Sequence, residues 1–176
     1  MKIMYLFFLL IPSMQAQTIY DFNRNSDASE WTSVDDVVMG GRSNGNFEIN
    51  GDGHGEFSGY VTTENNGGFS SIRCQIEKIL TTQDNKISLT LKGDGKEYQL
   101  RLKDNVKSYY SYITTFKTSG EWQKITIPVK DLYPSFRGRT LDLPNYNSSS
   151  FEEISILIGN KKKETFRLIL DKIELE

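Results

Sequence analysis

The sequence has 176 residues, of which 37% are hydrophobic, and its 21 basic and 23 acidic side chains give a net charge of −2. So small a charge argues against electrostatic binding of nucleic acid, and the single cysteine excludes both an intramolecular disulfide and a cysteine-rich zinc site. The single histidine likewise excludes a metal centre built from several histidines.

The chain opens with a pattern typical of a secretory signal peptide. An uninterrupted apolar run at residues 3–11 follows a basic residue, Pro12 ends the run, and Ala16 offers a small residue for cleavage. The run is much shorter than the roughly 20 residues that a membrane-spanning helix needs. We therefore expect residues 1–16 to be a signal peptide and residues 17–176 to form one periplasmic or secreted domain without a transmembrane segment.

Two loops with Gly-Gly pairs come next, at residues 31–43 and 64–73, and are called the motif loops below. Each places its glycines beside Asp, Asn or Ser side chains that can bond to nearby backbone N–H groups. We expect two tightly tied turns that bring one arginine, Arg42 or Arg73, close to the carboxylates of the loops. Those carboxylates are Asp35, Asp36 and Glu64.

Alternation of apolar and polar residues predicts β-strands through the following part of the chain. Residues 87–91 and 98–102 alternate strictly around a Gly-Asp-Gly turn, which predicts a β-hairpin. The pattern continues at residues 110–116, and a further strand at 122–128 ends on a proline. A single short helical turn is expected at residues 129–132.

The last part of the chain completes an all-β pattern. Residues 151–158 predict one strand, and residues 166–175 predict another whose two halves are out of phase, so we expect a β-bulge around Asp171 and Lys172. Helical periodicity is scarce and turn clusters recur between short strands. The fold class indicated is an all-β sandwich or jelly roll, in which two sheets share one core.

The motif loops allow two interpretations. They can form an internal polar network that pins two turns at one end of the sandwich, or they can form a rim that binds a ligand or a partner. The candidate ligand- or partner-binding residues are Asp35, Asp36, Met39, Gly40, Gly41, Ser43, Asn65, Asn66, Gly67, Gly68, Phe69, Ser71 and Arg73.

Several stretches in fixed order resemble the complex I intermediate-associated protein 30 family, over about residues 19–175. They are VDDVVMGGRS at 34–43, ENNGGFSSIR at 64–73, GEWQKITIP at 120–128, PSFRGR at 134–139 and FRLILDKI at 166–173. The resemblance implies a galactose-binding-like jelly roll without enzymatic activity. It also implies an assembly-factor role of the chaperone type, with subunits of the respiratory NADH dehydrogenase, complex I, as partners.

Other chemistry has little support in the sequence. His54 lies in a glycine-rich turn, where we expect a solvent-exposed ring, and the nearby Asp52 and Glu56 supply too few converging ligands for a metal site. A structural calcium ion remains an alternative. Cys74 is expected to be a small buried side chain. No cofactor is indicated, and one histidine with one cysteine leaves few pairs of nucleophile and base.

The aromatic residues support a second hypothesis about function. Tyr109, Tyr110 and Tyr112 form one cluster, and Tyr133, Phe136 and Tyr146 form another. These side chains fill the core or provide a platform for a sugar or a peptide. The sequence therefore favours a non-enzymatic, protein-binding domain of the assembly-factor type, and the alternative is an exported carbohydrate-binding module.

Overall fold

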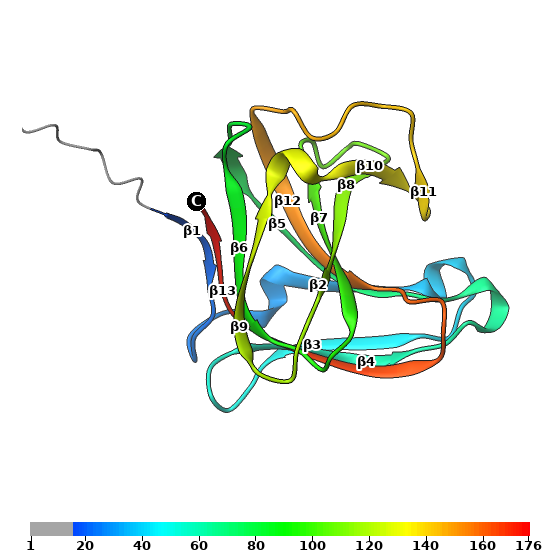
Figure 1. Ribbon diagram of the computed structural model, residues 1–176. Helices are drawn as coiled ribbons and strands as arrows, with labels where there is room; N and C mark the ends of the chain where they lie inside the picture. Colours follow the sequence, from blue (N-terminus) through cyan, green and yellow to red (C-terminus); the bar gives the residue numbers. More distant parts are fainter. Residues whose placement is uncertain (1–15) are drawn as a thin grey trace, which may run out of the picture.

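Two antiparallel β-sheets pack face to face in the computed structural model, which describes residues 16–176 (Figure 1). One sheet has the order β3-β4-β13-β6-β9, with β1 paired to β13. Its strands are β1 (Gln17–Asp21), β3 (Asn44–Ile49), β4 (Gly55–Val61), β6 (Lys86–Lys92), β9 (Trp122–Pro128) and β13 (Glu164–Leu175).

The other sheet has seven strands in the order β11-β10-β8-β7-β12-β5-β2. They are β2 (Trp31–Asp35), β5 (Ser70–Leu80), β7 (Glu97–Lys103), β8 (Ser111–Lys117), β10 (Tyr133–Phe136), β11 (Arg139–Thr140) and β12 (Ser150–Ile158). Short 3-10 turns lie between strands: η1 (Ala28–Glu30), η2 (Asp36–Met39), η3 (Glu64–Asn66) and η4 (Val129–Asp131). The predicted all-β sandwich and the short turn after residue 128 are confirmed.

The predicted signal peptide falls outside the described residues, apart from Ala16. Within residues 16–176, none of the helical segments has the length and apolar character needed to cross a membrane. The strand β1 lies beside β13, so the first described strand and the last strand are neighbours (Figure 1).

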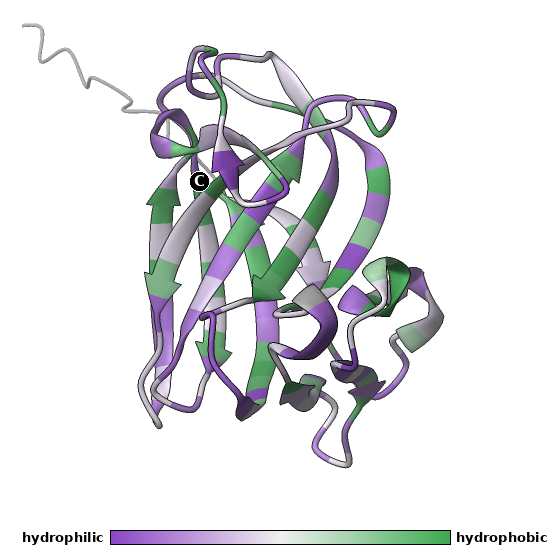
Figure 2. Ribbon diagram, turned by 90° about the vertical axis from the view of Figure 1, so that its right-hand side faces the viewer, coloured by the Kyte–Doolittle hydropathy of each residue, from purple (hydrophilic) through white to green (hydrophobic). Residues whose placement is uncertain are grey.

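The core lies between the sheets and is built by the alternation seen in the sequence. Figure 2 shows this alternation as purple and green bands along the strands. On β7, Leu100 and Leu102 are fully buried, whereas Arg101 between them projects from the opposite face. Phe57 on β4 and Leu89 on β6 are also fully buried and face them from the other sheet. Burial of one face of each sheet is the main source of stability.

The prediction of a hairpin at residues 87–102 is wrong in its pairing. Both strands exist, but β6 pairs with β13 and β9, whereas β7 pairs with β12 and β8 in the other sheet. The turn between them therefore crosses the sandwich. A hairpin within one sheet and a connection between two sheets both show alternating residues around a glycine-rich turn. The alternation indicates which face of a strand is buried, but not which strand lies next to it.

The predicted bulge in the last strand is confirmed. The register between β13 and β6 shifts between Leu170 and Lys172, which leaves Asp171 as the extra residue. A second shift, between Phe151 and Glu153, occurs where β12 meets β5. These shifts let apolar side chains on both sides of each bulge face the core.

Several connections cross from one sheet to the other at the same end of the sandwich. They include β2–β3 and β4–β5, which contain the motif loops, and β12–β13. In Figure 1 the two motif loops lie together at the right of the view. The topology thus brings these two separate sequence motifs to one place.

Candidate functional site

The motif loops meet at the side chain of Asp36, which begins η2 and is fully buried. Its Oδ1 accepts a hydrogen bond from the backbone N–H of Ser43 at 2.9 Å, and its Oδ2 accepts one from the Ser43 hydroxyl at 2.5 Å. The same Oδ2 accepts backbone N–H bonds from Gly68 at 2.6 Å and from Phe69 at 3.3 Å. One carboxylate therefore holds both loops.

Glycines make this close approach possible. A Cβ atom added to Gly41 would lie 2.2 Å from Asp36 Oδ1, and one added to Gly67 would lie 2.5 Å from Asp36 Oδ2. Gly40 has a φ of +88°, in the left-handed region, and closes η2 by donating its N–H to Val37. Each Gly-Gly pair is thus needed to wrap backbone around the carboxylate.

The hydrogen bonds also set the charge of Asp36. Burial acts to raise the pKa of this carboxyl, but the bonds donated by Ser43, Gly68 and Phe69 outweigh it and hold the pKa below its usual value. The carboxylate is therefore charged at neutral pH. Because four donors already occupy its two oxygens, its arrangement is that of a structural anchor and not of a free general base.

Asp35 makes a second tie between the same segments. Its Oδ1 accepts a hydrogen bond from the Ser70 hydroxyl at 2.6 Å, and its Oδ2 accepts one from the N–H of Gly45 at 3.1 Å. The Ser71 hydroxyl donates to the backbone carbonyl of Val34 at 2.9 Å. Together with the Asp36 bonds, these contacts form the internal polar network that was one of the two interpretations.

The exposed side of the network carries charges from a third crossing connection. Glu64 Oε1 is 2.5 Å from Lys163 Nζ, in the β12–β13 connection, and Glu64 Oε2 is 3.4 Å from Arg42 Nη1. All three side chains are exposed. Surface pairs of this kind contribute little to stability, so they orient the loops more than they hold them.

Of the two arginines expected to lie near the carboxylates of the loops, Arg42 does so and Arg73 does not. Arg42 does lie beside a carboxylate, but Arg73 projects from the outer face of the seven-stranded sheet, opposite Thr32 and Ser155. Strand alternation accounts for this, because Ile72 and Cys74 on either side of it are buried in the core. The same alternation was readable from the sequence.

The remaining candidates lie on the outer part of the loops. Asn65 is exposed and has a φ of +53°, and the backbone of Asn66 belongs to η3. Phe69 is half-buried, and its carbonyl accepts the N–H of Asp36 at 3.3 Å. The structure brings Asp35, Asp36, Gly41, Ser43, Gly67, Gly68 and Phe69 together and leaves Arg73 apart from them.

An exposed apolar segment stands on this anchored base. Val37, Val38 and Met39, called the apolar tip below, are 60%, 73% and 50% exposed. They follow directly after the fully buried Asp36, within η2. Of the three, only Met39 was predicted from the sequence as a candidate. The available signal was a run of apolar residues inside a polar, glycine-rich loop, where no strand or helix partner would cover it.

The two predicted aromatic clusters join into one chain of rings, except for Tyr133. Tyr146 and Tyr112 are buried with centroids 5.1 Å apart, and Tyr110 lies 5.4 Å from Tyr112. Tyr109 lies 5.2 Å from Tyr110 and 5.2 Å from Phe136. The chain therefore runs from the core to the surface, where Tyr109 is 63% exposed.

His54 differs from the expectation of a simple exposed turn residue. It is half-buried, its ring centroid lies 4.8 Å from that of Trp122, and its Nδ1 is 3.1 Å from Asp171 Oδ1. Cys74 is buried as expected, and burial, followed by the charges of Glu30 and Glu153, raises its pKa to about 11. Within residues 16–176, no three metal-ligating side chains converge.

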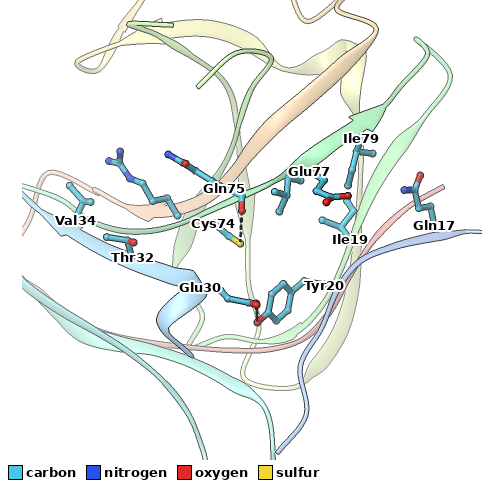
Figure 3. A pocket seen from close by; sticks show the side chains of 12 residues that line it. Gln17, Ile19, Tyr20, Glu30, Thr32, Val34, Cys74, Gln75, Glu77 and Ile79 are labelled. Carbon is cyan, nitrogen blue, oxygen red and sulfur yellow. Dashed lines mark hydrogen bonds between the residues drawn. The ribbon is translucent and has the colours of Figure 1, made fainter. Parts of the chain in front are cut away.

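A groove of about 780 Å³ runs between β1, β2 and β5 (Figure 3). Apolar side chains of Ile19, Ile76 and Ile79 line one part of it. In Figure 3 the Tyr20 hydroxyl points to Glu30, to which it donates a hydrogen bond of 2.6 Å. This groove was not predicted from the sequence, because its presence depends on which strands meet at the sheet edges.

Both motif loops lie within the part of the chain that matches a known family. The model of the complex I intermediate-associated protein 30 family, CIA30, matches residues 20–170. The chain belongs to this family. The match contains both motif loops and the whole Asp36 network of this CIA30 domain, and the resemblance stated from the sequence is confirmed.

Solved structures similar to the CIA30 domain share its fold. A family 11 carbohydrate-binding module from Clostridium thermocellum, in complex with a β-1,3-1,4-mixed-linked tetrasaccharide, has a TM-score of 0.66 at 16% identity and covers 93% of this chain and 96% of its own. A structure of a family 4 carbohydrate-binding module has a TM-score of 0.53 at 14% identity, covering 88% and 91%. The agarase AgWH50C has a TM-score of 0.61 at 12% identity, over 92% of this chain and 24% of the agarase. These likenesses confirm the jelly-roll sandwich.

Proposed function

We propose that this CIA30 domain is a non-catalytic docking domain that binds a protein partner through the apolar tip. The observation that carries the proposal is the exposure of Val37, Val38 and Met39 directly after a fully buried, multiply bonded Asp36. A segment held this way binds with little loss of conformational entropy, because its backbone is already ordered.

The chemistry of the tip fits a protein surface. Three adjacent apolar side chains that stay in water cost free energy, and a partner that covers them recovers it at about 25 cal/mol per Å². Arg42 and Glu64 lie in the two motif loops that hold the tip and supply charges for orientation. Apolar centre and charged surroundings together are the usual composition of a protein interface.

The non-catalytic part of the proposal rests on the state of the reactive groups. The Cys74 thiol is buried with a pKa of about 11, so the thiolate needed for nucleophilic attack is scarce at neutral pH. The Asp36 carboxylate is fully bonded. His54 lies beside Asp171 and Trp122, and among the described residues no hydrogen bond joins its ring to Cys74 or Asp36.

Val38→Asp tests the docking surface. A charge at the centre of the tip should weaken partner binding by about 10-fold or more, equivalent to roughly 1.4 kcal/mol, as for other central interface residues. Because Val38 is 73% exposed, the melting temperature should stay the same. The measurement is quantitative affinity capture from envelope and membrane extracts of the producing organism.

Leu80→Asp is the matched control, because Leu80 is also 73% exposed but lies at the end of β5. We expect the control to capture the same partner as the unmodified protein. Equal capture by the Val38→Asp variant would contradict the proposal. Recovery of complex I subunits by the unmodified protein would support the assembly-factor role that the family name describes.

A second candidate function, glycan binding, is favoured by the exposed end of the aromatic chain. Tyr109 and Phe136 form an edge-to-face pair at the surface, and the Arg137 guanidinium lies 5.2 Å above the Phe136 ring. Exposed aromatic faces of this kind stack against sugar rings. The neighbouring fold of a module solved with a mixed-linked tetrasaccharide supports the same candidate.

Tyr109→Ala tests this candidate. Glycan binding at the aromatic pair predicts that a gel containing mixed-linkage β-glucan retards the unmodified protein. The variant should be retarded less. If the unmodified protein migrates equally in gels with and without glycans, across a panel of glycans, glycan binding at the aromatic pair is excluded. Lys130→Ala, another exposed residue, serves as the control.

A further inference from the structure

A row of three polar side chains crosses the outer face of the seven-stranded sheet. Ser155 on β12 pairs with Arg73 on β5 and with Arg101 on β7, so all three side chains project from the same face. The adjacent residues Ile154 and Ile156 are fully buried on the opposite, core face. Arg73, Ser155 and Arg101 are called the arginine row below.

In the described part of the chain, the two guanidiniums of the row form no hydrogen bond or ion pair with a side chain. Elsewhere Arg42 pairs with Glu64, and Arg167 makes bonds of 2.8 and 2.9 Å to Glu56. Within the part of the chain that the structure describes, no hydrogen bond or ion pair joins Arg73 or Arg101 to another side chain. Burial, and after it the charge of Arg73, lowers the pKa of Arg101, and the negative charge of Glu153 acts in the opposite direction. Two like charges therefore face each other across a serine.

A buried carboxylate lies next to the row, close enough to Arg101 for its charge to act on the guanidinium. Glu153 on β12 projects from the same face as Ser155 and is only 4% exposed. Among residues 16–176, no ion pair or hydrogen bond joins its carboxylate to another side chain, but its negative charge acts on the guanidinium of Arg101. A carboxylate accepts several hydrogen bonds, so a ligand hydroxyl can donate to Glu153.

The small side chains along the row are covered, and one end of the row meets a groove. Ser155 is 7% exposed and Ile113, which pairs with Arg101, is 4% exposed, although both lie on the outer side of the sheet. At its other end the row meets the groove of about 780 Å³, whose lining includes Arg73, Thr32 and Gln75 (Figure 3). The groove is large enough for a sugar residue, and Arg73 is the member of the row that lines it.

We propose that the arginine row binds the carboxylate of an acidic saccharide, with a neighbouring hydroxyl of the sugar donating to Glu153. A guanidinium binds a carboxylate through two parallel N–H bonds, and a second guanidinium across Ser155 adds charge to the same point. An acidic peptide would bring carboxylates to Glu153 without hydroxyl donors, and like charges would oppose it there. The inference rests on the second candidate function and names the ligand class for it.

The test is affinity gel electrophoresis of the protein in a gel that contains polygalacturonate. Arg101→Gln and Arg73→Gln are each expected to weaken binding by about 10-fold or more, the effect of losing a hydrogen bond to a charged group. Arg139→Gln is the matched control, since it removes the same charge from an exposed residue on β11 of the same sheet. It should bind like the unmodified protein.

Two further variants and ligands separate the outcomes. Arg101→Lys keeps the charge but not the paired N–H geometry, so we expect it to bind several-fold more weakly than the unmodified protein. This variant tests the row if Arg101→Gln does not fold. Fully methyl-esterified polygalacturonate, which lacks the charge, should not retard the protein. Equal retardation of the variants and the control, or equal binding to polyglutamate, would overturn the proposal.

Binding to a neutral glucan and the behaviour of the Val38→Asp variant separate the arginine row from the two proposed functions. Binding to mixed-linkage β-glucan without binding to polygalacturonate would overturn the acidic ligand and leave the glycan candidate standing. Absence of binding to either would overturn both. The Val38→Asp variant should retain polygalacturonate binding, because the tip and the arginine row are separate surfaces.

Discussion

Burial of a charged carboxylate without a counter-ion is costly, and Asp36 is fully buried. At the scale of the residue, its charge is met by four hydrogen bonds, three of them from backbone N–H groups. Backbone donors are fixed by the fold, so they stabilise the charge without ordering long side chains. The motif residues around Asp36 therefore supply the hydrogen-bond donors that its carboxylate needs.

Substitution of Asp36 by Asn should destabilise the domain by about 3 kcal/mol, because the new amide presents N–H groups to donors that need an acceptor. Asp84→Asn is the control, since Asp84 is exposed, and it should leave the free energy of unfolding unchanged. Urea denaturation measures both. Similar values for the two variants would show that the network does not hold the fold.

The pH dependence of stability should carry the signature of Asp36. Its native pKa lies below the unfolded value of about 3.9, so the unfolded state binds the proton more tightly. The stabilisation is complete above about pH 4 and is lost as the pH falls through the native pKa. The difference in melting temperature between the unmodified protein and Asp36→Asn should shrink below that pH. A constant difference from pH 7 to pH 3 would contradict this assignment.

At the scale of the element, the two motif loops are crossing connections between sheets. β2–β3 and β4–β5 reach the same end of the sandwich, and the Asp36 bonds join the first to the second. A loop closed in this way loses freedom already in the unbound state. The apolar tip is therefore presented in one conformation, which is what a docking surface requires.

Gly41→Ala tests the packing of the loops against the carboxylate. A Cβ atom there would lie 2.2 Å from Asp36 Oδ1, so we expect a loss of about 2 kcal/mol from overpacking. Gly120→Ala is the control, because nothing lies within 4 Å of its Cβ position and its φ is not in the left-handed region. Thermal denaturation of both variants makes the comparison. Equal melting temperatures would mean that the loop shifts without cost.

At the scale of the whole molecule, period-two alternation predicted the strands well and their partners poorly. It placed β6 and β7 correctly, because each buries one face, but it could not assign them to different sheets. The bulge at Asp171 was predictable from a change of phase in the apolar residues. Pairing across the sandwich depends on contacts far apart in the sequence, which alternation does not record.

The candidate site shows the same division. The Gly-Gly loops were predicted as tied turns, and they are, since Asp, Ser and Gly have local bonding preferences. Arg73 was assigned to them because of its charge, although Ile72 and Cys74 beside it already placed it on the outer face. The exposure of Val37 and Val38 was missed, because apolar residues are ordinarily assigned to a core.

The most direct test of the docking function is photocrosslinking from the apolar tip in the producing cells. A photoreactive phenylalanine analogue at position 38 should give one crosslinked product with a discrete protein partner, whereas the same analogue at the control position 80, equally exposed, should not. Mass spectrometry of the product identifies the partner. If position 38 gave no crosslink, or the same products as position 80, the apolar tip would not be the docking surface.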